Sequence, residues 1–569
     1  MLDIKILAAL IIIMALGAIA GILVYNNMNP ETTGTCKPLI GLDNKSTTNN
    51  TPDDNNNYFT SDSLFDLNSY SPKSDGHFKP SPGPVPQADP INRVISLFDA
   101  YLKSIFNESG VPGSAVVIVK DKEIIYMITL GVKDLSSGAP VTKDTLFEIG
   151  SCTKAFTATN IAQLVSAGLM SWDDPISKYY NNTSQFQMYD PSVTGNLTIL
   201  DCLSHRSGQP EYSQDMEWIL FNNSYSPMLY NLRYVKNNTP FGSTYGYNNI
   251  IYSLPGYYAA QATNTTWSDL IKEYLLNPLG MSTATSTVKD FFNSPDHATP
   301  YRLLGNGTLI PYQAANLDAV GPAGVISASI SEMAHWLKFQ IAGTGYYNGV
   351  PLVSKENLDK TRTGQIYAPG LGGYYGLGWI ISNLSFGNKS LDVITHSGDT
   401  LSSQTVTSIF PTEGLGMVVL TNVGPTGLDF GLTLFSKLFT LICGYENYDP
   451  WPSYKDMNKP VPYPAPTPPF IDALGLGNYT GVYNNYLYGN ITITTDNNVL
   501  TCYFGNNFQP YTLEHWNANL FLEPSMDLPL YFTHIHDGCA QQLVVEGISD
   551  YSTIPAETKS VFNRTNSTS

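Results

Sequence analysis

Strand-like patterns at both ends of a long helical stretch constrain the fold of this chain more than any other feature. At one end, SAVVIVK and EIIYMITLG are two β-rich runs around Asp121-Lys122, after a helical pattern that begins near Asn92. At the other end, VITHS, TVTSIF and GMVVLTN again have the character of strands, and LTLFSKLFTLICG is helical. Helical patterns dominate residues 152–340. This order predicts an α/β sheet that carries an inserted all-α domain.

Two Pro-rich segments divide the chain of 569 residues, which is too long for one core. Residues 26–90 are polar and predict a disordered stalk, and residues 451–470 predict a linker. Residues 91–450 then form the main domain. The last part, residues 471–565, contains the runs YTGVY, NITITT, LTCYFG, LYFTHI and QLVVEG, which predict a small all-β module, sandwich or barrel.

The N-terminus contains an uncharged apolar run, residues 6–25, about long enough to cross a bilayer as a helix. The triplet Ala18-Ile19-Ala20 would suit a signal peptidase, but the run continues beyond it, which favours an uncleaved signal anchor. We therefore expect residues 1–25 to be a short cytosolic tail and a membrane span, with the bulk of the chain extracellular or luminal. Secretion after signal cleavage is the alternative.

Charge and cysteine content narrow the possible partners. Lys and Arg total 29 against 47 Asp and Glu, a net charge of -18, and no basic run is interleaved with aromatics, so we expect no nucleic acid partner. The 16 N-x-S/T sequons fit a glycoprotein. The six cysteines are too sparse for a disulfide scaffold, and Cys502 with Cys539 is the closest candidate pair.

The stretch IGSCTKAF, residues 149–156, brings a serine and a lysine together. If a helix starts here, Ser151 and Lys154 share a face at i and i+3, and AFTATNIAQLVSAG continues as a helix that ends at Gly168. A serine becomes a nucleophile beside a base, and burial makes lysine a base. A second S-x-x-K, starting at Ser286, has no amphipathic helix after it and is not expected to be a site.

The surroundings of Ser151 resemble a known family. The segments LFEIGSCTKAFTATNIAQLVSAG, LTILDCLSHRSGQP, YGYNNIIYSLPGYYA, GPAGVISASISEMAHWLKF, YGLGWI and THSGDT follow the order of landmarks in the serine β-lactamase and penicillin-binding-protein-like family, in particular its class C-related, esterase and D-aminopeptidase-like branch. The resemblance covers about residues 91–445. It implies an antiparallel sheet flanked by helices with an inserted all-α subdomain. The C-terminal module resembles the accessory β-barrel of many members.

The resemblance also implies roles for single residues. Ser151 would be the acylated nucleophile, Lys154 its base partner and Tyr247 the residue that relays a proton to the leaving group. Asn249 would orient the amide or carbonyl of the substrate. Tyrosine, with its ordinary pKa near 10, works as an acid or base only beside a cation such as Lys154.

A later segment would supply the other side of the site. His396, Ser397 and Gly398 stand where other branches have Lys-Thr-Gly, and the backbone N–H of Asp399 would be the second oxyanion donor, after that of Ser151. The family usually has glycine where this chain has Asp399. The carboxylate either turns away, or weakens the oxyanion hole, or meets a cationic group of the substrate.

These observations predict a serine hydrolase that acts through an acyl-enzyme on a small-molecule or peptide amide or ester. One alternative is a catalytically inactive, membrane-anchored scaffold or binding protein that keeps the fold; another is a β-lactam or D-alanyl-peptide hydrolase. This acyl-enzyme mechanism needs no cofactor or metal, and His534 and His536, which could bind a metal on one face of a strand, lack a third ligand. The absence of G-x-S-x-G excludes an α/β-hydrolase nucleophile elbow.

Overall fold

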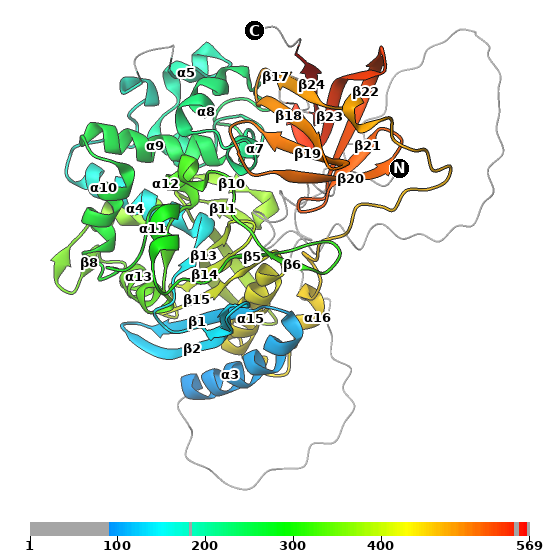
Figure 1. Cartoon of the computed structure of the whole chain (residues 1–569). Helices are drawn as coiled ribbons and strands as arrows, with labels where there is room; N and C mark the ends of the chain where they lie inside the picture. The colour runs from blue at the N-terminus through cyan, green and yellow to red at the C-terminus, as the bar shows by residue number, and fades with distance from the viewer. Residues whose placement is uncertain (1–89, 181–184, 551–556, 566–569) are drawn as a thin grey trace, which may run out of the picture.

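The computed structural model describes residues 90–180, 185–550 and 557–565, and its main body is organised around one sheet of nine strands (Figure 1). Every pair of neighbouring strands is antiparallel, and β1 joins the early strands to the late ones by pairing with β15. The strand order is β10 (Ile366–Ala368), β11 (Gly373–Tyr375), β12 (Ile380–Phe386), β13 (Lys389–Asp399), β14 (Gln404–Phe410), β15 (Leu415–Thr421), β1 (Gly113–Lys120), β2 (Glu123–Asp134) and β3 (Ala139–Pro140). The sheet is thus built from both ends of the main domain, as predicted.

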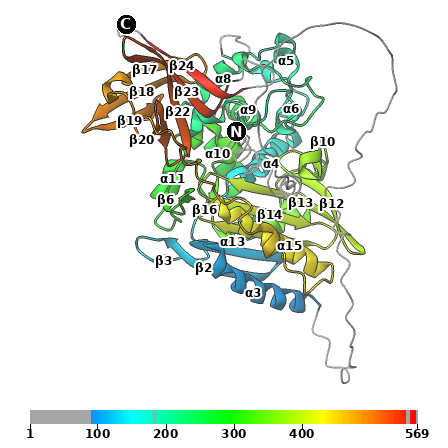
Figure 2. The ribbon, with the colours of Figure 1, turned by 90° about the vertical axis from the view of Figure 1, so that its right-hand side faces the viewer.

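Helices cover both faces of this sheet because successive side chains of a strand point in opposite directions. Val116 and Ile118 of β1 join one buried cluster, and Val117 and Val119 join another. The helices in the first cluster are α3 (Pro90–Ser109) and α15 (Thr426–Ile442), and those in the second include α4 (Thr153–Ser166) and α13 (Ile330–Ala342). Figures 1 and 2 both show α3 beside β2 at the base of the molecule.

The inserted region is helical, as expected, and it encloses α4. Its helices are α5 (Pro191–Asn196), α6 (Ile199–Leu203), α7 (Asp215–Ile219), α8 (Tyr225–Asn231), α9 (Asn249–Ala262), α10 (Trp267–Ile271), α11 (Val288–Asn293) and α12 (Gly321–Gly324). Helix α4 is buried on nearly all sides between the sheet and this region. Its polar residues Thr157 and Thr159 donate to the carbonyls of Pro322 and Ala155 instead of facing water.

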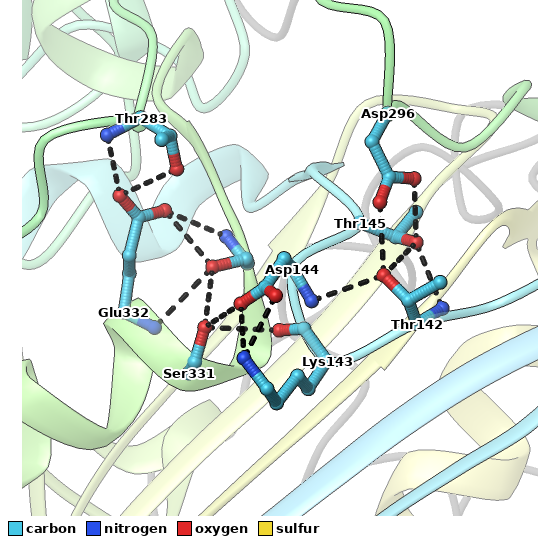
Figure 3. A network of polar contacts seen from close by, with 9 residues as sticks. Thr142, Lys143, Asp144, Thr145, Thr283, Asp296, Ser331 and Glu332 are labelled. Carbon is cyan, nitrogen blue, oxygen red and sulfur yellow. Dashed lines mark hydrogen bonds and ion pairs between the residues drawn. The ribbon is translucent and has the colours of Figure 1, made fainter.

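Short elements complete the main domain and fix the loop before the serine turn. They are β4 (Phe147–Glu148) paired with β7 (Ser327–Ala328), the hairpin β8 (Tyr346–Tyr347) and β9 (Val350–Pro351), α14 (Lys355–Thr361), and the small sheet of β5 (Tyr301–Leu303), β6 (Leu309–Pro311) and β16 (Val423–Gly424). Figure 3 shows a polar network around the segment before β4, in which Asp296 accepts from Thr142 and Thr145. In the same view Glu332 of α13 reaches Thr283. This network secures the segment that leads into β4 and Ser151.

The C-terminal module is a closed antiparallel barrel, which confirms the predicted barrel. Its strands are β17 (Gly481–Asn485), β18 (Gly489–Asp496), β19 (Val499–Phe504), β20 (Tyr511–Asn517), β21 (Leu520–Glu523), β22 (Leu528–His536), β23 (Cys539–Asp550) and β24 (Glu557–Arg564). Large aromatic side chains such as Tyr483, Phe504 and Phe562 fill its interior. The alternation of β19 buries Leu500, Cys502 and Phe504 on the inner side.

Three further predictions concern the cysteine pair, the second S-x-x-K and the linker. The suggested Cys502–Cys539 pair is wrong: both are free, because β19 and β23 are separated by three strands of the barrel. A short helix, α11, does follow Ser286, but that serine is buried and bonded to Ser268. Within the predicted linker, α16 (Trp451–Tyr454) and Asn458 pack against the main domain.

The predicted span at residues 6–25 and the predicted stalk, apart from Pro90 at the start of α3, lie outside the described residues. Among the helices of residues 90–565 that the structure describes, none combines the length and the apolar character that crossing a bilayer requires.

Candidate active site

Ser151 lies in a tight turn that leads directly into α4. The turn is a single 3₁₀ turn, Gly150–Cys152, between β4 and the helix, so the serine sits at the mouth of a helix as the sequence predicts. Gly150 has φ +52°, and a Cβ there would lie 2.4 Å from the backbone N of Asp399. Glycine is therefore required for two reasons, the left-handed backbone and the approach of β13.

Lys154 is fully buried one turn after Ser151, and its amine makes three polar contacts. Nζ lies 3.0 Å from Ser151 Oγ, 2.7 Å from Asn249 Oδ1 and 2.9 Å from the carbonyl oxygen of Ala323. Burial lowers the pKa of Lys154 to about 7. A neutral amine has two N–H groups and one lone pair, and two of the three contacts can only accept. The lone pair is then directed at Ser151.

Tyr247 approaches Ser151 from the other side. Its hydroxyl donates to Ser151 Oγ over 2.7 Å, and Lys154 Nζ lies 4.6 Å from the centre of its ring. Burial raises the pKa of Tyr247, so the phenol is neutral and serves as a proton donor. The buried ring of His205 packs against Tyr247, with ring centres 4.3 Å apart, and holds it in place.

Asn249 connects the lysine to a buried carboxyl group that sequence reasoning did not identify. Its Oδ1 accepts from Lys154, and its Nδ2 donates to Asp215 Oδ2 over 2.8 Å. Asp215 Oδ1 also accepts from Trp218 Nε1 over 3.1 Å. Burial raises the pKa of the Asp215 carboxyl to about 6. The predicted role of Asn249 as a substrate ligand is thus joined by a second one, holding the amine of Lys154.

Strand β13 forms another wall of the cavity. A Cβ on Gly398 would lie 1.8 Å from the carbonyl oxygen of Ile149, so the strand runs backbone to backbone against the serine turn. Ser397 and Asp399 line the cavity. The Asp399 carboxylate also bends back to accept from Leu401 N over 2.5 Å, and burial raises its pKa to about 6.

His396 does not line the cavity, although its ring centre lies 6.4 Å from that of Tyr247. Because strand side chains alternate, His396 faces the opposite side from Ser397 and Asp399. Its Nε2 is 3.1 Å from the hydroxyl of Tyr375, and burial lowers the pKa of His396 to about 3. The structure therefore places it as a neutral support of the strand. Cys152, the neighbour of the nucleophile, also packs behind it, and its Sγ donates to the carbonyl of His396.

The cavity itself is small and has aromatic and acidic walls. Its lining residues are Ser151, Tyr212, Asp215, Trp218, Ile219, Tyr247, Asn249, Ser397, Asp399 and Leu401. The structure brings together seven of the eight predicted site residues at or beside this cavity, Gly398 through its backbone. The residues contributed by α7 and Tyr212 had no signal in the sequence, since a five-residue helix has no periodicity. Among the described residues, no three His, Cys, Asp or Glu side chains converge as a metal site would require.

Two family models match this chain. The model described as Beta-lactamase matches residues 94–435, and the one described as Domain of unknown function (DUF3471) matches residues 465–557. The first match covers the sheet, the helical region and all the cavity residues. The second covers most of the barrel.

Individual relatives are distant. Protein flp of Staphylococcus aureus is 25% identical over 351 residues, which are 62% of this chain and 67% of that protein. An unguisins hydrolase, ungD', of Aspergillus campestris is 25% identical over 433 residues, covering 70% of this chain and 77% of that protein. Among solved structures, an octameric penicillin-binding protein homologue from Pyrococcus abyssi aligns with a TM-score of 0.54 and 22% identity, over 79% of this chain and 98% of that chain.

Proposed function

Because this chain belongs to the beta-lactamase family, we propose that it is a serine hydrolase that cleaves amides or esters through an acyl-enzyme on Ser151. The observation that supports this most is the set of hydrogen bonds made by the amine of Lys154. Its two N–H groups donate to Asn249 and Ala323, which leaves its lone pair for the proton of Ser151. A base aimed at a nucleophile at hydrogen-bond distance is the arrangement that nucleophilic catalysis requires.

Acylation would move protons among Ser151, Lys154 and Tyr247. Lys154 takes the proton of Ser151 Oγ as the oxygen attacks the substrate carbonyl, and the backbone N–H groups of Ser151 and Asp399 stabilise the oxyanion. Tyr247 donates its phenolic proton to the leaving amine or alkoxide and is reprotonated from the lysine. Water then attacks the acyl group, with Tyr247 and Lys154 acting as the base, and releases the acid.

The walls of the cavity favour some substrates over others. Asp215 and Asp399 line it, and its described lining residues include no Arg or Lys. A substrate with a carboxylate beside the scissile bond, as in β-lactams, would meet negative charge without a cation to bind it. We therefore place neutral or cationic acyl esters and amides ahead of β-lactams. The bent-back Asp399 carboxylate weakens the case for an inactive site.

Labelling with a fluorescent fluorophosphonate tests this proposal. The probe should modify the full chain at Ser151, and Ser151→Ala should abolish the adduct. Ser286→Ala is the matched control, because Ser286 belongs to the second S-x-x-K and is bonded to Ser268 away from the cavity. Absence of a Ser151-dependent adduct on folded protein would refute the proposal. Short acyl esters, D-amino-acid amides and a chromogenic cephalosporin would then rank the substrate classes.

A further inference from the structure

Helix α7 forms one wall of the cavity although it has only five residues. Asp215, Trp218 and Ile219 of this helix line the cavity. A helix of one turn and a half leaves almost all of its backbone groups without partners inside the helix. The position of this wall is therefore determined by the groups that bind α7 from outside.

Four consecutive carbonyl groups at the end of α7 have partners in two parts of the molecule. The carbonyls of Trp218 and Ile219 accept from the backbone N of Asn316 and Ala315, over 2.8 and 3.0 Å, within the main domain. The next two accept from the loop that follows β19 of the barrel. Leu220 O is 3.1 Å from Asn507 Nδ2, and Phe221 O is 3.1 Å from Asn506 N.

The side chain of Phe221 anchors this end of α7 in the barrel. It is fully buried, and its ring centre lies 5.4 Å from those of Tyr488 and Phe504 and 6.0 Å from that of Phe562. Gly505 has φ +53°, and a Cβ there would lie 2.6 Å from Phe221 O, so the loop approaches as closely as a glycine allows.

A second link runs through Glu217 of the same helix. Its buried carboxylate accepts from Gln214 over 2.8 Å and from Asn223 and Asn231 over 2.9 Å each. Asn231 also donates to the carbonyl of Leu487, in the turn between β17 and β18, over 2.9 Å. The middle of α7 and the residues directly after its C-terminal end are thus both tied to barrel loops, and Figure 1 shows the helix beside β17 and β18.

The other face of α7 leads to the reacting atoms. Asp215 accepts from Asn249, and Asn249 accepts from the amine of Lys154 that contacts Ser151. We propose that the C-terminal barrel is a working part of the active site, which holds α7 through Phe221 and thereby positions the cavity wall, Asn249 and Lys154. This inference rests on the proposed hydrolase function. Phe221 acts as a positioning residue, since it touches no cavity atom itself.

The test compares variants of the full chain. Phe221→Ala should lower kcat/KM for p-nitrophenyl acetate about tenfold or more, because small displacements of positioning groups are costly in catalysis. Phe221→Leu, which keeps most of the volume, should recover most of the activity. Phe532→Ala is the matched control: it empties a similar space in the barrel among Tyr479, Tyr483 and Phe521. It should change kcat/KM less than Phe221→Ala does.

Amide hydrogen exchange supplies a readout that does not need turnover. Amide hydrogen exchange at residues 211–223 should be faster in Phe221→Ala than in the wild-type protein. In Phe532→Ala it should be unchanged. Unchanged exchange at these residues in Phe221→Ala, or unchanged kcat/KM in an active enzyme, would overturn the inference. A wild-type protein without Ser151-dependent turnover would instead refute the hydrolase proposal, while the exchange comparison would still decide whether the barrel holds α7.

Discussion

The amine of Lys154 is the residue-scale feature on which the chemistry depends. Two of its neighbours, Asn249 Oδ1 and Ala323 O, accept hydrogen bonds and so orient the two N–H groups of the neutral form. The protonated form would donate a third bond to Ser151 and could not take its proton. Activity should therefore follow the deprotonation of this one group.

The rate of fluorophosphonate labelling should rise with pH and reach half its maximum near pH 7, because burial lowers the pKa of Lys154 to about 7. The negative charge of Asp215 partly opposes this shift and raises the pKa of Lys154. Asp215→Asn should then move the midpoint to lower pH. Asp429→Asn changes a buried carboxyl group of α15 that accepts a hydrogen bond from Asn458, and it should leave the midpoint unchanged. A flat profile between pH 5 and 9, or a midpoint that rises in Asp215→Asn, would contradict this role for Lys154.

Gly398 allows β13 to touch the serine turn, and this contact can be broken by one methyl group. A Cβ at this position would lie 1.8 Å from Ile149 O and 3.2 Å from Cys152 N, so either the strand or the turn must move. Gly398→Ala should lower the labelling rate of Ser151 about a hundredfold, since it displaces an oxyanion donor. Gly195→Ala, where a Cβ would meet nothing within 4 Å, is the control and should label normally. Equal rates for both variants would show that the contact is unimportant.

At the scale of elements, α13 is fixed by one carboxylate. Glu332 closes a capping box with Ser329 and also accepts from the backbone N of Thr283 and Ala284. Glu332→Ala would leave the buried N–H groups of Ala284 and Ser329 without this partner and should lower the free energy of unfolding by about 3 kcal/mol. Glu356→Ala, in the first turn of α14 but exposed, should cost much less. Chemical denaturation monitored by circular dichroism would measure the difference, and equal losses would argue against the network of Figure 3.

The sequence predicts elements well where a pattern repeats and poorly where it does not. The strands β1, β13, β14 and β15 follow from short β-rich runs, and the start of α4 follows from the order of motifs. The alternation of side chains along a strand, applied to residues 396–399, shows that His396 and Ser397 cannot both face one cavity. The α7 wall could not be predicted, because Asp215 and Trp218 reach the site through tertiary contacts of a helix too short to leave a pattern. Phe221 could not be predicted either, since its partners lie more than 260 positions further along the chain.

At the scale of the whole molecule, the buried apolar residues of the helical region and of the barrel form one continuous cluster. Such continuity predicts that the two parts unfold together. Calorimetry of the full chain should show one cooperative transition spanning both, and Phe221→Ala should separate it into two. Two transitions in the wild-type protein would mean that the interface contributes little to stability.

The change of partner from the main domain to the barrel at the end of α7 also bears on protein engineering. A chimera that exchanges the barrel at the Pro-rich segment 451–470 would keep Leu220 and Phe221 but lose Asn506, Asn507 and the aromatic socket that receives the ring. The unit that can be recombined is therefore discontinuous in sequence, and consists of the barrel together with residues 214–223. A chimera that receives both pieces should select the substrates of the protein that supplied them, whereas a chimera that receives the barrel alone should not.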